Sequence, residues 1–197
     1  MEKQVILSPK NSDYLAINEK VLNIIQEALK TYSSTDSVSY NNEEEVQNFP
    51  FEFINSLTPS RMPSHHLNLK VGAIVMLLRN LSISQGLCNG TRMKVQKLHE
   101  HCIEASLITG SNRGCTVLIP RIKLSSNDAD IPFTLNRHQF CLRLAYSITV
   151  NKTQGQTFEK VGIHLPQPVF SHGQLCHIFK STSYEQYQSK SYDTQLG

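Results

Sequence analysis

A short apolar run, a tight polar turn and an amphipathic helix open the chain, and this order constrains the fold more than any other feature. Val5-Ile6-Leu7 ends at Ser8-Pro9, which predicts a buried strand leading into a turn. Apolar residues then recur at spacings of three and four: Leu15, Val21, Leu22, Ile25, Ala28 and Leu29. This spacing predicts an amphipathic helix of about four turns, capped by Ser12 or Asp13. A strand followed by a helix is the βα unit of an α/β sheet, so we expect a parallel sheet with a helix packed against it.

Strand patterns replace the helical spacing in the middle of the chain. Gly72 to Leu78 is dense in β-branched and aliphatic residues. Further short strands are expected at Met93–Val95, Ile103–Ile108 and Thr116–Ile119. Asn89-Gly90 predicts a two-residue hairpin, because a type I′ turn needs positive φ at both central positions. Several short strands with turns predict a small barrel or curled sheet, inserted after the first βα unit.

Two stretches before this β-rich block are less regular. Residues 31–48 are rich in Ser, Asn and Glu with little periodicity, so we expect a surface excursion there. Phe49 to Leu57 is expected to form a short helix, ended by Thr58-Pro59 and Met62-Pro63.

The α/β character returns at Phe140. Strands are expected over Leu142–Ala145, Ile148–Val150 and Val161–Leu165. Ser171 can cap a final helix that continues through Phe179, and the Ser-, Tyr- and Gln-rich tail beyond it is expected to fray.

The charge is distributed unevenly along the chain. Residues 1–60 hold four Lys/Arg against nine Asp/Glu, a net charge of −5. Residues 61–126 hold nine against two, a net charge of +7, and residues 127–197 hold six against five, a net charge of +1. A concentrated block of positive charge suggests contact with phosphates, although a basic, solvated β-surface would have the same composition.

Composition argues against disulfide-rich, zinc-binding, membrane and secreted proteins. The five cysteines are odd in number and form no C-x-x-C pair, which is poor material for a disulfide framework or a zinc knuckle. His99-Glu100-His101-Cys102 lacks a third ligand at a recognised zinc spacing, so we expect strand-edge polar residues there and no metal. No window approaches the roughly 18 apolar residues of a membrane span, and the first residues lack the layout of a signal peptide. We expect an intracellular protein without a membrane partner.

The stretch Leu144-Ala-Tyr-Ser-Ile-Thr-Val-Asn-Lys-Thr-Gln-Gly-Gln-Thr157 narrows the function. It resembles the fifth motif of superfamily-one helicases, and most closely that of the Pif-type (petite integration frequency) DNA helicases and the related Helitron helicases. Leu7-Ser-Pro-Lys-Asn11 resembles the fourth motif, and Val169-Phe-Ser-His-Gly-Gln-Leu175 resembles the approach to the sixth. The inserted 2B element of that family is resembled in three segments: Phe53–Ser60, Leu69–Asn80 and Gly86–Arg92.

The resemblance implies an α/β fold: a partial RecA-like second domain, of the P-loop NTPase type, with a small β-rich 2B insert. It divides the chain into residues 1–49 (first part of the RecA-like domain), 50–139 (2B-type insert with flanking strands), 140–180 (return to the RecA-like domain, with a degenerate sixth motif) and 181–197 (tail).

The resemblance also implies residue roles. The side chains expected to contact the DNA backbone are Lys10, Asn11, Thr149, Asn151 and Lys152, with Arg92 as a further candidate. Gln154, Gly155 and Thr157 are expected at the nucleotide edge. Hydroxyl, amide and ammonium donors of this kind suit a backbone phosphate. Without the motif, Thr149 and Thr157 are better explained as turn-capping hydroxyls. Asn89-Gly90 is better explained as a hairpin turn than as a DNA contact.

The sequence contains no catalytic residue for ATP hydrolysis that we can name. Phosphoryl transfer needs a G-x-x-x-x-G-K-[ST] loop and carboxylates for Mg²⁺, but no Gly-Lys dipeptide occurs here. The family's arginine finger aligns with Ser181, and the adjacent Lys180 is a point charge without a planar fork. We therefore expect no cofactor for the chain alone, and ATP with Mg²⁺ only when a first RecA-like domain completes it.

The favoured hypothesis is a C-terminal piece of an ATP-dependent DNA helicase that binds single-stranded DNA but does not hydrolyse ATP alone. By resemblance, the parent activity would be DNA unwinding in repair, recombination, telomere maintenance or Helitron transposition, in the nucleus of a eukaryote. Two alternatives stay open. The chain is half of a split helicase completed by a separate ATP-binding domain, or it is a transposon-derived remnant without activity.

Overall fold

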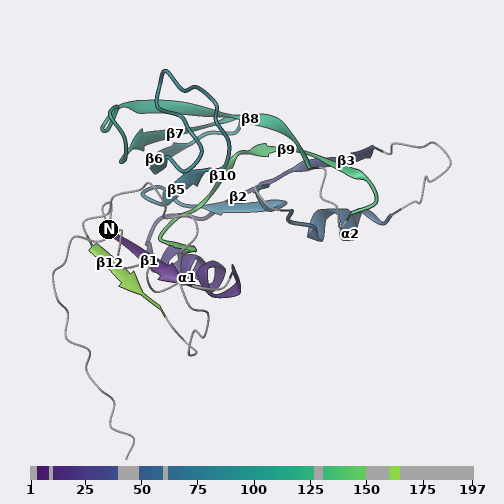
Figure 1. Ribbon diagram of the computed structural model, residues 1–197, viewed down its shortest axis with the longest axis horizontal. Helices are drawn as coiled ribbons and strands as arrows, with labels where there is room; N and C mark the ends of the chain where they lie inside the picture. The colour runs from purple at the N-terminus through teal and green to yellow at the C-terminus, as the bar shows by residue number, and fades with distance from the viewer. Residues whose placement is uncertain are drawn as a thin grey trace, which may run out of the picture.

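The computed structural model describes residues 4–8, 11–39, 49–59, 62–126, 131–149 and 160–164. Its strands form three sheets, of three, seven and two strands. Figure 1 shows α1 and β1 below the seven-stranded sheet. Among the described residues, no helix is both long and apolar enough to cross a membrane.

The three-stranded sheet is parallel and has the order β11-β1-β12. Its strands are β1 (Gln4–Ser8), β11 (Ser147–Thr149) and β12 (Lys160–Ile163). Helix α1 (Asn11–Ile24) follows β1 and packs against β1 and β11. This arrangement confirms the predicted βα unit and the return of α/β structure near residue 140.

Helix α1 ends at Ile24, before the last apolar positions of the predicted helical pattern. The carbonyl of Ile25 accepts a hydrogen bond from Lys70 Nζ at 2.7 Å. An ammonium group at a helix C-terminus satisfies an otherwise unpaired carbonyl and interacts favourably with the helix dipole. The chain then turns into β2, which places Leu29 outside the helix.

The seven-stranded sheet is antiparallel and has the order β10-β5-β6-β7-β8-β9-β3. Its strands are β3 (Thr35–Ser39), β5 (Ile74–Leu77), β6 (Arg92–Leu98), β7 (Cys102–Leu107), β8 (Thr116–Ser126), β9 (Thr134–Phe140) and β10 (Leu142–Leu144). The predicted strands of the β-rich block are confirmed. The sheet also takes in β3 and β10, from segments on either side of the predicted insert of residues 50–139.

The prediction of an irregular surface segment over residues 31–48 is wrong for the first part of that range. β2 (Lys30–Ser33) pairs with β4 (His66–Leu69), and β3 pairs with β9. Both strands are rich in Ser and Thr and have exposed faces, so they lack the apolar alternation that marks a half-buried strand. Their partners lie far away in sequence, and only tertiary pairing makes them strands.

Asn89-Gly90 forms a turn but is not a two-residue hairpin connection between paired strands. The Thr91 N–H donates to the Cys88 carbonyl at 3.0 Å, and Gly90 has a φ of 88°. The turn lies inside the long connection between β5 and β6, where Gly90 N–H donates to Leu77 O. Glycine is required at that positive φ, so the sequence signal was correct for the turn and wrong for the hairpin.

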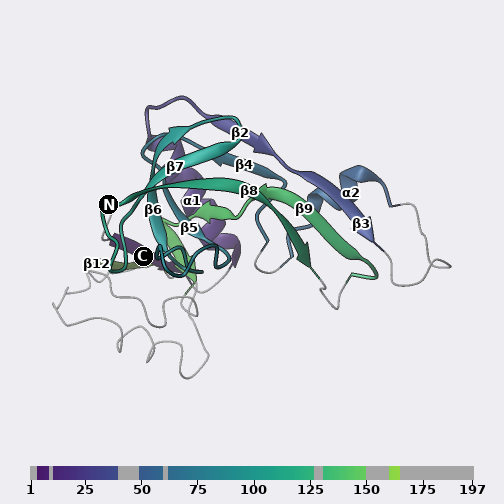
Figure 2. The same ribbon diagram turned by 90° about the horizontal axis from the view of Figure 1, so that it is seen from above.

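A projecting part of the molecule, which we call the arm, consists of β3, β9, the second half of β8 (residues 121–126) and helix α2 (Phe51–Ser56). Figures 1 and 2 show these elements extending together away from α1. The predicted helix in residues 49–57 is thus confirmed as α2. Inside the arm, Arg137 and Asp36 form a buried ion pair, with Nη2 and Oδ2 2.6 Å apart.

Candidate nucleic-acid interface

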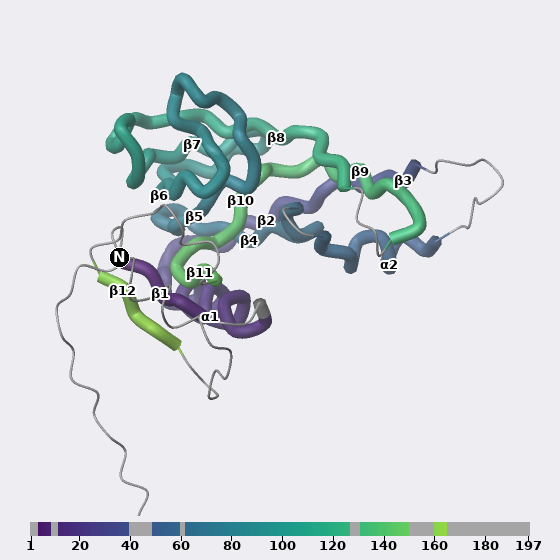
Figure 3. The backbone as a smooth tube through the Cα atoms, viewed as in Figure 1, coloured from purple at the N-terminus to yellow at the C-terminus, as the bar shows by residue number. Residues whose placement is uncertain are grey.

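The parallel sheet brings the fourth-motif and fifth-motif segments to one edge. Strands β1 and β11 are parallel neighbours, and Ser8 and Thr149 are partners in register at their carboxyl ends. The tube in Figure 3 shows β1, β11 and β12 lying beside α1. Chain segments that leave neighbouring parallel strands at the same edge meet there, and open α/β sheets bind ligands at such edges.

The predicted contact residues follow these two strand ends at matching distances. Lys10 and Asn11 come two and three residues after Ser8, and Asn151 and Lys152 come two and three residues after Thr149. Thr149 is the last residue of β11 and is half-buried, and Asn11 begins α1. Lys10, Asn151, Lys152, Gln154, Gly155 and Thr157 lie outside the described residues, as do His172, Lys180 and Ser181.

A third strand end lies at the same edge. β12 pairs with β1 in parallel with Leu7 opposite Ile163, and the His164 N–H donates to the Leu7 carbonyl at 2.8 Å. His164 is exposed and follows Ile163 directly, next to the end of β1, which separates it from β11. Sequence reasoning did not single out His164, because its place at this edge depends on the pairing of β12 with β1.

Arg92 is not at the surface, which corrects the expectation of a phosphate contact there. Its side chain is fully buried, and its Nη2 donates to the carbonyls of Gln4 and Ala145, both at 3.0 Å. Burial lowers the pKa of Arg92 to about 10, so the guanidinium is protonated at neutral pH. A buried arginine on β6 therefore ties the β-rich insert to the parallel sheet.

The segment Ala145–Ser147, which we call the junction, is held from several sides. The Tyr146 hydroxyl accepts a hydrogen bond from the Ile74 N–H at 2.9 Å, and the Ala145 N–H donates to the Ile74 carbonyl at 2.9 Å. Asn18 on α1 accepts from the N–H groups of Tyr146 and Ser147 and donates to the Ser147 carbonyl. Insert, helix and parallel sheet thus meet immediately before Thr149. Sequence reasoning missed Asn18, whose partners lie more than 120 residues away.

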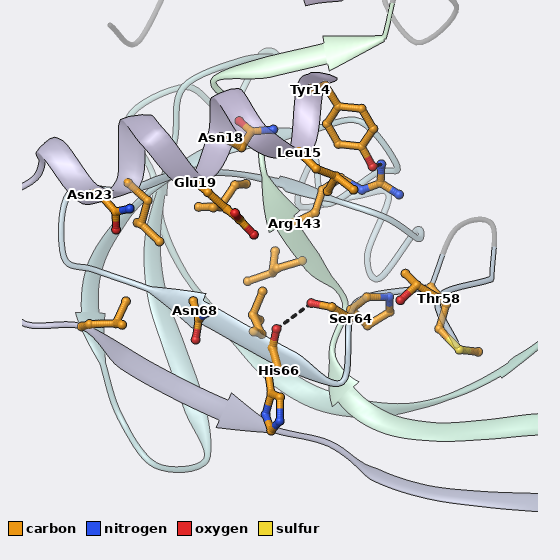
Figure 4. Close-up of a pocket in the computed structure, with 17 residues that line it drawn as sticks. Tyr14, Leu15, Asn18, Glu19, Asn23, Thr58, Ser64, His66, Asn68 and Arg143 are labelled. Carbon is orange, nitrogen blue, oxygen red and sulfur yellow. Dashed lines mark hydrogen bonds between the residues drawn. The ribbon is translucent and has the colours of Figure 1, made fainter. Parts of the chain in front are cut away.

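A cavity of about 370 Å³ lies between α1 and the segments of the insert that face it (Figure 4). At one end, Arg143 Nη1 donates to the Tyr14 hydroxyl at 2.9 Å, and the guanidinium lies 5.6 Å from the Tyr14 ring centre. The remaining lining mixes leucines with amide and hydroxyl side chains. Asn18 is among the lining residues, and Thr149 is not.

Within the described ranges, no group of three or more His, Cys, Asp or Glu side chains is arranged to hold a metal ion. His99 Nε2 lies 3.7 Å from Glu104 Oε2, at the surface of the insert.

Comparison with known proteins agrees with this geometry. Residues 52–98 match the family model of the DNA helicase Pif1 2B domain. The ATP-dependent DNA helicase PIF1 of Homo sapiens is 30% identical over 162 residues, covering 75% of this chain and 24% of that protein. The Xenopus laevis protein is 29% identical over 159 residues, covering 75% and 25%. The chain spans about a quarter of the length of these curated relatives.

Solved structures give the same result. The crystal structure of Pif1 helicase from Candida albicans superposes with a TM-score of 0.65 and 27% identity, covering 88% of this chain and 42% of that one. The crystal structure of Bacteroides Pif1 bound to ssDNA superposes with a TM-score of 0.63 and 25% identity, covering 92% and 38%.

The parallel sheet with its helix and the β-rich insert define a partial RecA-like domain that carries a 2B element. The chain is a homologue of the Pif1-type ATP-dependent DNA helicases and corresponds to their C-terminal portion.

Proposed function

We propose that this chain binds single-stranded DNA as the second RecA-like domain, with 2B insert, of a Pif1-type helicase inside the cell. The observation that carries the proposal is the register of β1 and β11, in which Ser8 and Thr149 are neighbours at one sheet edge. In the sequence, the segments that hold Lys10 and Lys152 follow these two neighbouring strand ends. A relative whose crystal structure is described as bound to ssDNA shares 25% identity over most of this chain and supports the same ligand.

The residue types at this edge suit a phosphate backbone. Lys10 and Lys152 supply ammonium charge, and Asn11, Thr149 and Asn151 supply amide and hydroxyl donors. Contacts of this kind position a strand without reading its bases, so binding should be sensitive to salt and tolerant of sequence.

ATP chemistry needs groups that these 197 residues do not contain, above all a Gly-Lys phosphate loop. We propose that Gln154, Gly155 and Thr157 contribute to a nucleotide site only together with a first RecA-like domain. That domain would supply the residues that hold ATP and Mg²⁺.

The test is fluorescence anisotropy of a labelled single-stranded oligonucleotide titrated with the full chain at two salt concentrations. We expect saturable binding that weakens as salt rises. Lys152→Ala should weaken binding on the order of tenfold, because a charge-assisted contact is lost.

The matched control is Lys97→Ala, which removes the same charge from an exposed side chain on the insert, paired with Glu104 at 3.4 Å. It should leave binding nearly unchanged. A soluble, cooperatively folded chain that does not bind the oligonucleotide would overturn the proposal and favour the inactive remnant.

A further inference from the structure

We propose that Asn18 is a positioning residue that sets the spacing between the two DNA-contacting segments of this domain. The inference rests on the proposed function, because it assigns a role to a residue behind the same sheet edge. Asn18 does not contact DNA in this account; it acts through the backbone at the junction.

The contacts of Asn18 are unusually complete for a side chain in the middle of a helix. Its Oδ1 accepts from the N–H groups of Tyr146 and Ser147, both at 2.9 Å. Its Nδ2 donates to the Ser147 carbonyl at 3.0 Å. Asn18 is only 2% exposed, although it borders the cavity beside α1.

Asparagine is a poor choice for helix stability alone. It has lower helix propensity than alanine or leucine, and a buried amide is costly unless it is fully hydrogen-bonded. Leu22, one turn further along α1, is an apolar side chain in the core, as is usual for the buried face of a helix. The amide of Asn18 therefore has a specific role: it forms hydrogen bonds with backbone groups of the junction, which an apolar side chain cannot do.

The two elements joined by Asn18 each carry one contact segment. Helix α1 begins at Asn11, directly after Lys10, and β11 ends at Thr149, directly before the segment with Asn151 and Lys152. Asn18 lies seven residues after the helix start, about 10 Å along the axis. A bond at that point fixes the start of the helix relative to the end of the strand.

The junction is also fixed against β1, which completes the frame. Ser147 Oγ donates to the Ile6 carbonyl at 3.0 Å, and the Ile6 N–H donates to the Tyr146 carbonyl at 2.9 Å. Asn18 thus connects α1 to the start of β11, which is itself hydrogen-bonded to β1. Successive phosphates of one strand have a set spacing, so two contact segments must keep a matching separation to engage together.

The experiment measures single-stranded DNA affinity for the wild type, Asn18→Ala, Lys152→Ala and the double variant, well below the melting temperature of each. If Asn18 positions the Lys152 segment, Asn18→Ala should weaken binding on the order of tenfold. The double variant should also bind only about tenfold more weakly than the wild type, because the second change removes a contact that the first has already lost. The salt dependence should fall by the same amount in both single variants.

Asn23→Ala is the matched control, since it removes the same amide from an exposed position on the same helix. It should bind as the wild type does. If Asn18→Ala does not fold, Asn18→Leu keeps a side chain of similar length and a good helix propensity, removes the same three hydrogen bonds and should give a loss of the same kind.

Hydrogen exchange gives a readout that does not need DNA. In the free protein, Asn18→Ala should speed exchange of the Tyr146 and Ser147 amides, while Asn23→Ala should not. Weaker binding with Lys152→Ala but normal binding with Asn18→Ala overturns this inference alone, as do losses that multiply in the double variant. A wild type that does not bind single-stranded DNA overturns the proposed function and this inference together.

Discussion

Arg137 illustrates at the residue scale how a charged side chain is used inside this protein. Its guanidinium is fully buried and forms three bonds to the Asp36 carboxylate, at 2.6, 3.0 and 3.1 Å. It also donates to the carbonyls of Leu57 and Pro63, both at 2.9 Å. One arginine therefore connects β9, β3 and the segment after α2.

Replacement of Arg137 by Met should destabilise the protein by about 3–5 kcal/mol, because the Asp36 carboxylate would stay buried without its partner. Urea unfolding followed by circular dichroism measures the loss. Arg113→Met makes the same change at an exposed turn and should cost less than about 0.5 kcal/mol. Equal stabilities for the two variants would show that the buried pair is not important for the fold.

His65 lies against the same pair, with Nδ1 2.8 Å from Ser34 Oγ and 3.6 Å from Asp36 Oδ2. Burial lowers the pKa of His65 below its ordinary value of 6.5, and His66 adds to the effect, while the nearby Asp36 opposes it. The folded state thus holds His65 neutral at a pH where the unfolded chain already takes up a proton. The stability from this group is complete above pH 6.5 and is lost as the pH falls through the lower folded value.

The matching measurement is the urea midpoint at about pH 7.5 and about pH 5.5 for the wild type and His65→Gln. We expect a smaller drop for His65→Gln than for the wild type. His138→Gln, at an exposed position on β9, should drop as much as the wild type. A drop that does not depend on His65 would rule out this histidine as the source.

At the scale of elements, α2 shows how a very short helix is stabilised. Six residues are far too few for an independent helix. Ile54 is 3% exposed and packs in the arm core with Met62, Leu124 and Phe133, while Phe51 on the other face is 70% exposed. The helix therefore depends on tertiary packing of one side chain.

Ile54→Ala should cost about 2–4 kcal/mol of unfolding free energy, from lost burial and the remaining cavity. Phe51→Ala removes a larger but exposed side chain and should cost less than about 1 kcal/mol. Chemical denaturation of both variants checks the contrast. A larger loss at Phe51 would mean that the exposed face of α2 is covered in solution.

Elements were predictable where their sequence pattern is local. The first strand and the helix after it, β1 and α1, and the apolar strand β5 follow from spacing alone. β2 and β3 were missed because their exposed Ser and Thr residues show no apolar alternation. Likewise, the positive charge of Arg92 suggested a phosphate contact, but the side chain is buried against two carbonyls.

At the scale of the whole molecule, the RecA-like part and the insert share their cores. One cluster combines Val5 and Leu7 of β1 with Ile74 and Met76 of β5. A second combines Leu22 of α1 with the inner residues of β5, β6 and β7. The Arg92 bonds add a polar connection between the same parts, so the described structure should behave as one cooperative unit.

Unfolding should therefore be a single transition. Circular dichroism, which reports all elements, and hydrogen exchange of β1 and of β7 should give the same midpoint in urea. Arg92→Leu should lower that midpoint and allow the two parts to unfold separately, because the carbonyls of Gln4 and Ala145 lose their donor. Two separate transitions in the wild type would contradict the shared core.

The sequence by itself determined the strands and helices that have a local apolar pattern, the α/β character with its β-rich insert, and the motif segments that resemble a Pif-type helicase. These are local properties of spacing and composition. Only the tertiary structure decided that Ser8 and Thr149 end side by side, that Arg92 is buried, and that Asn18 binds the junction. Such contacts join residues up to 141 positions apart in the chain. This separation along the chain explains why the sequence did not predict these contacts, because no local pattern records which distant backbone groups a side chain will meet.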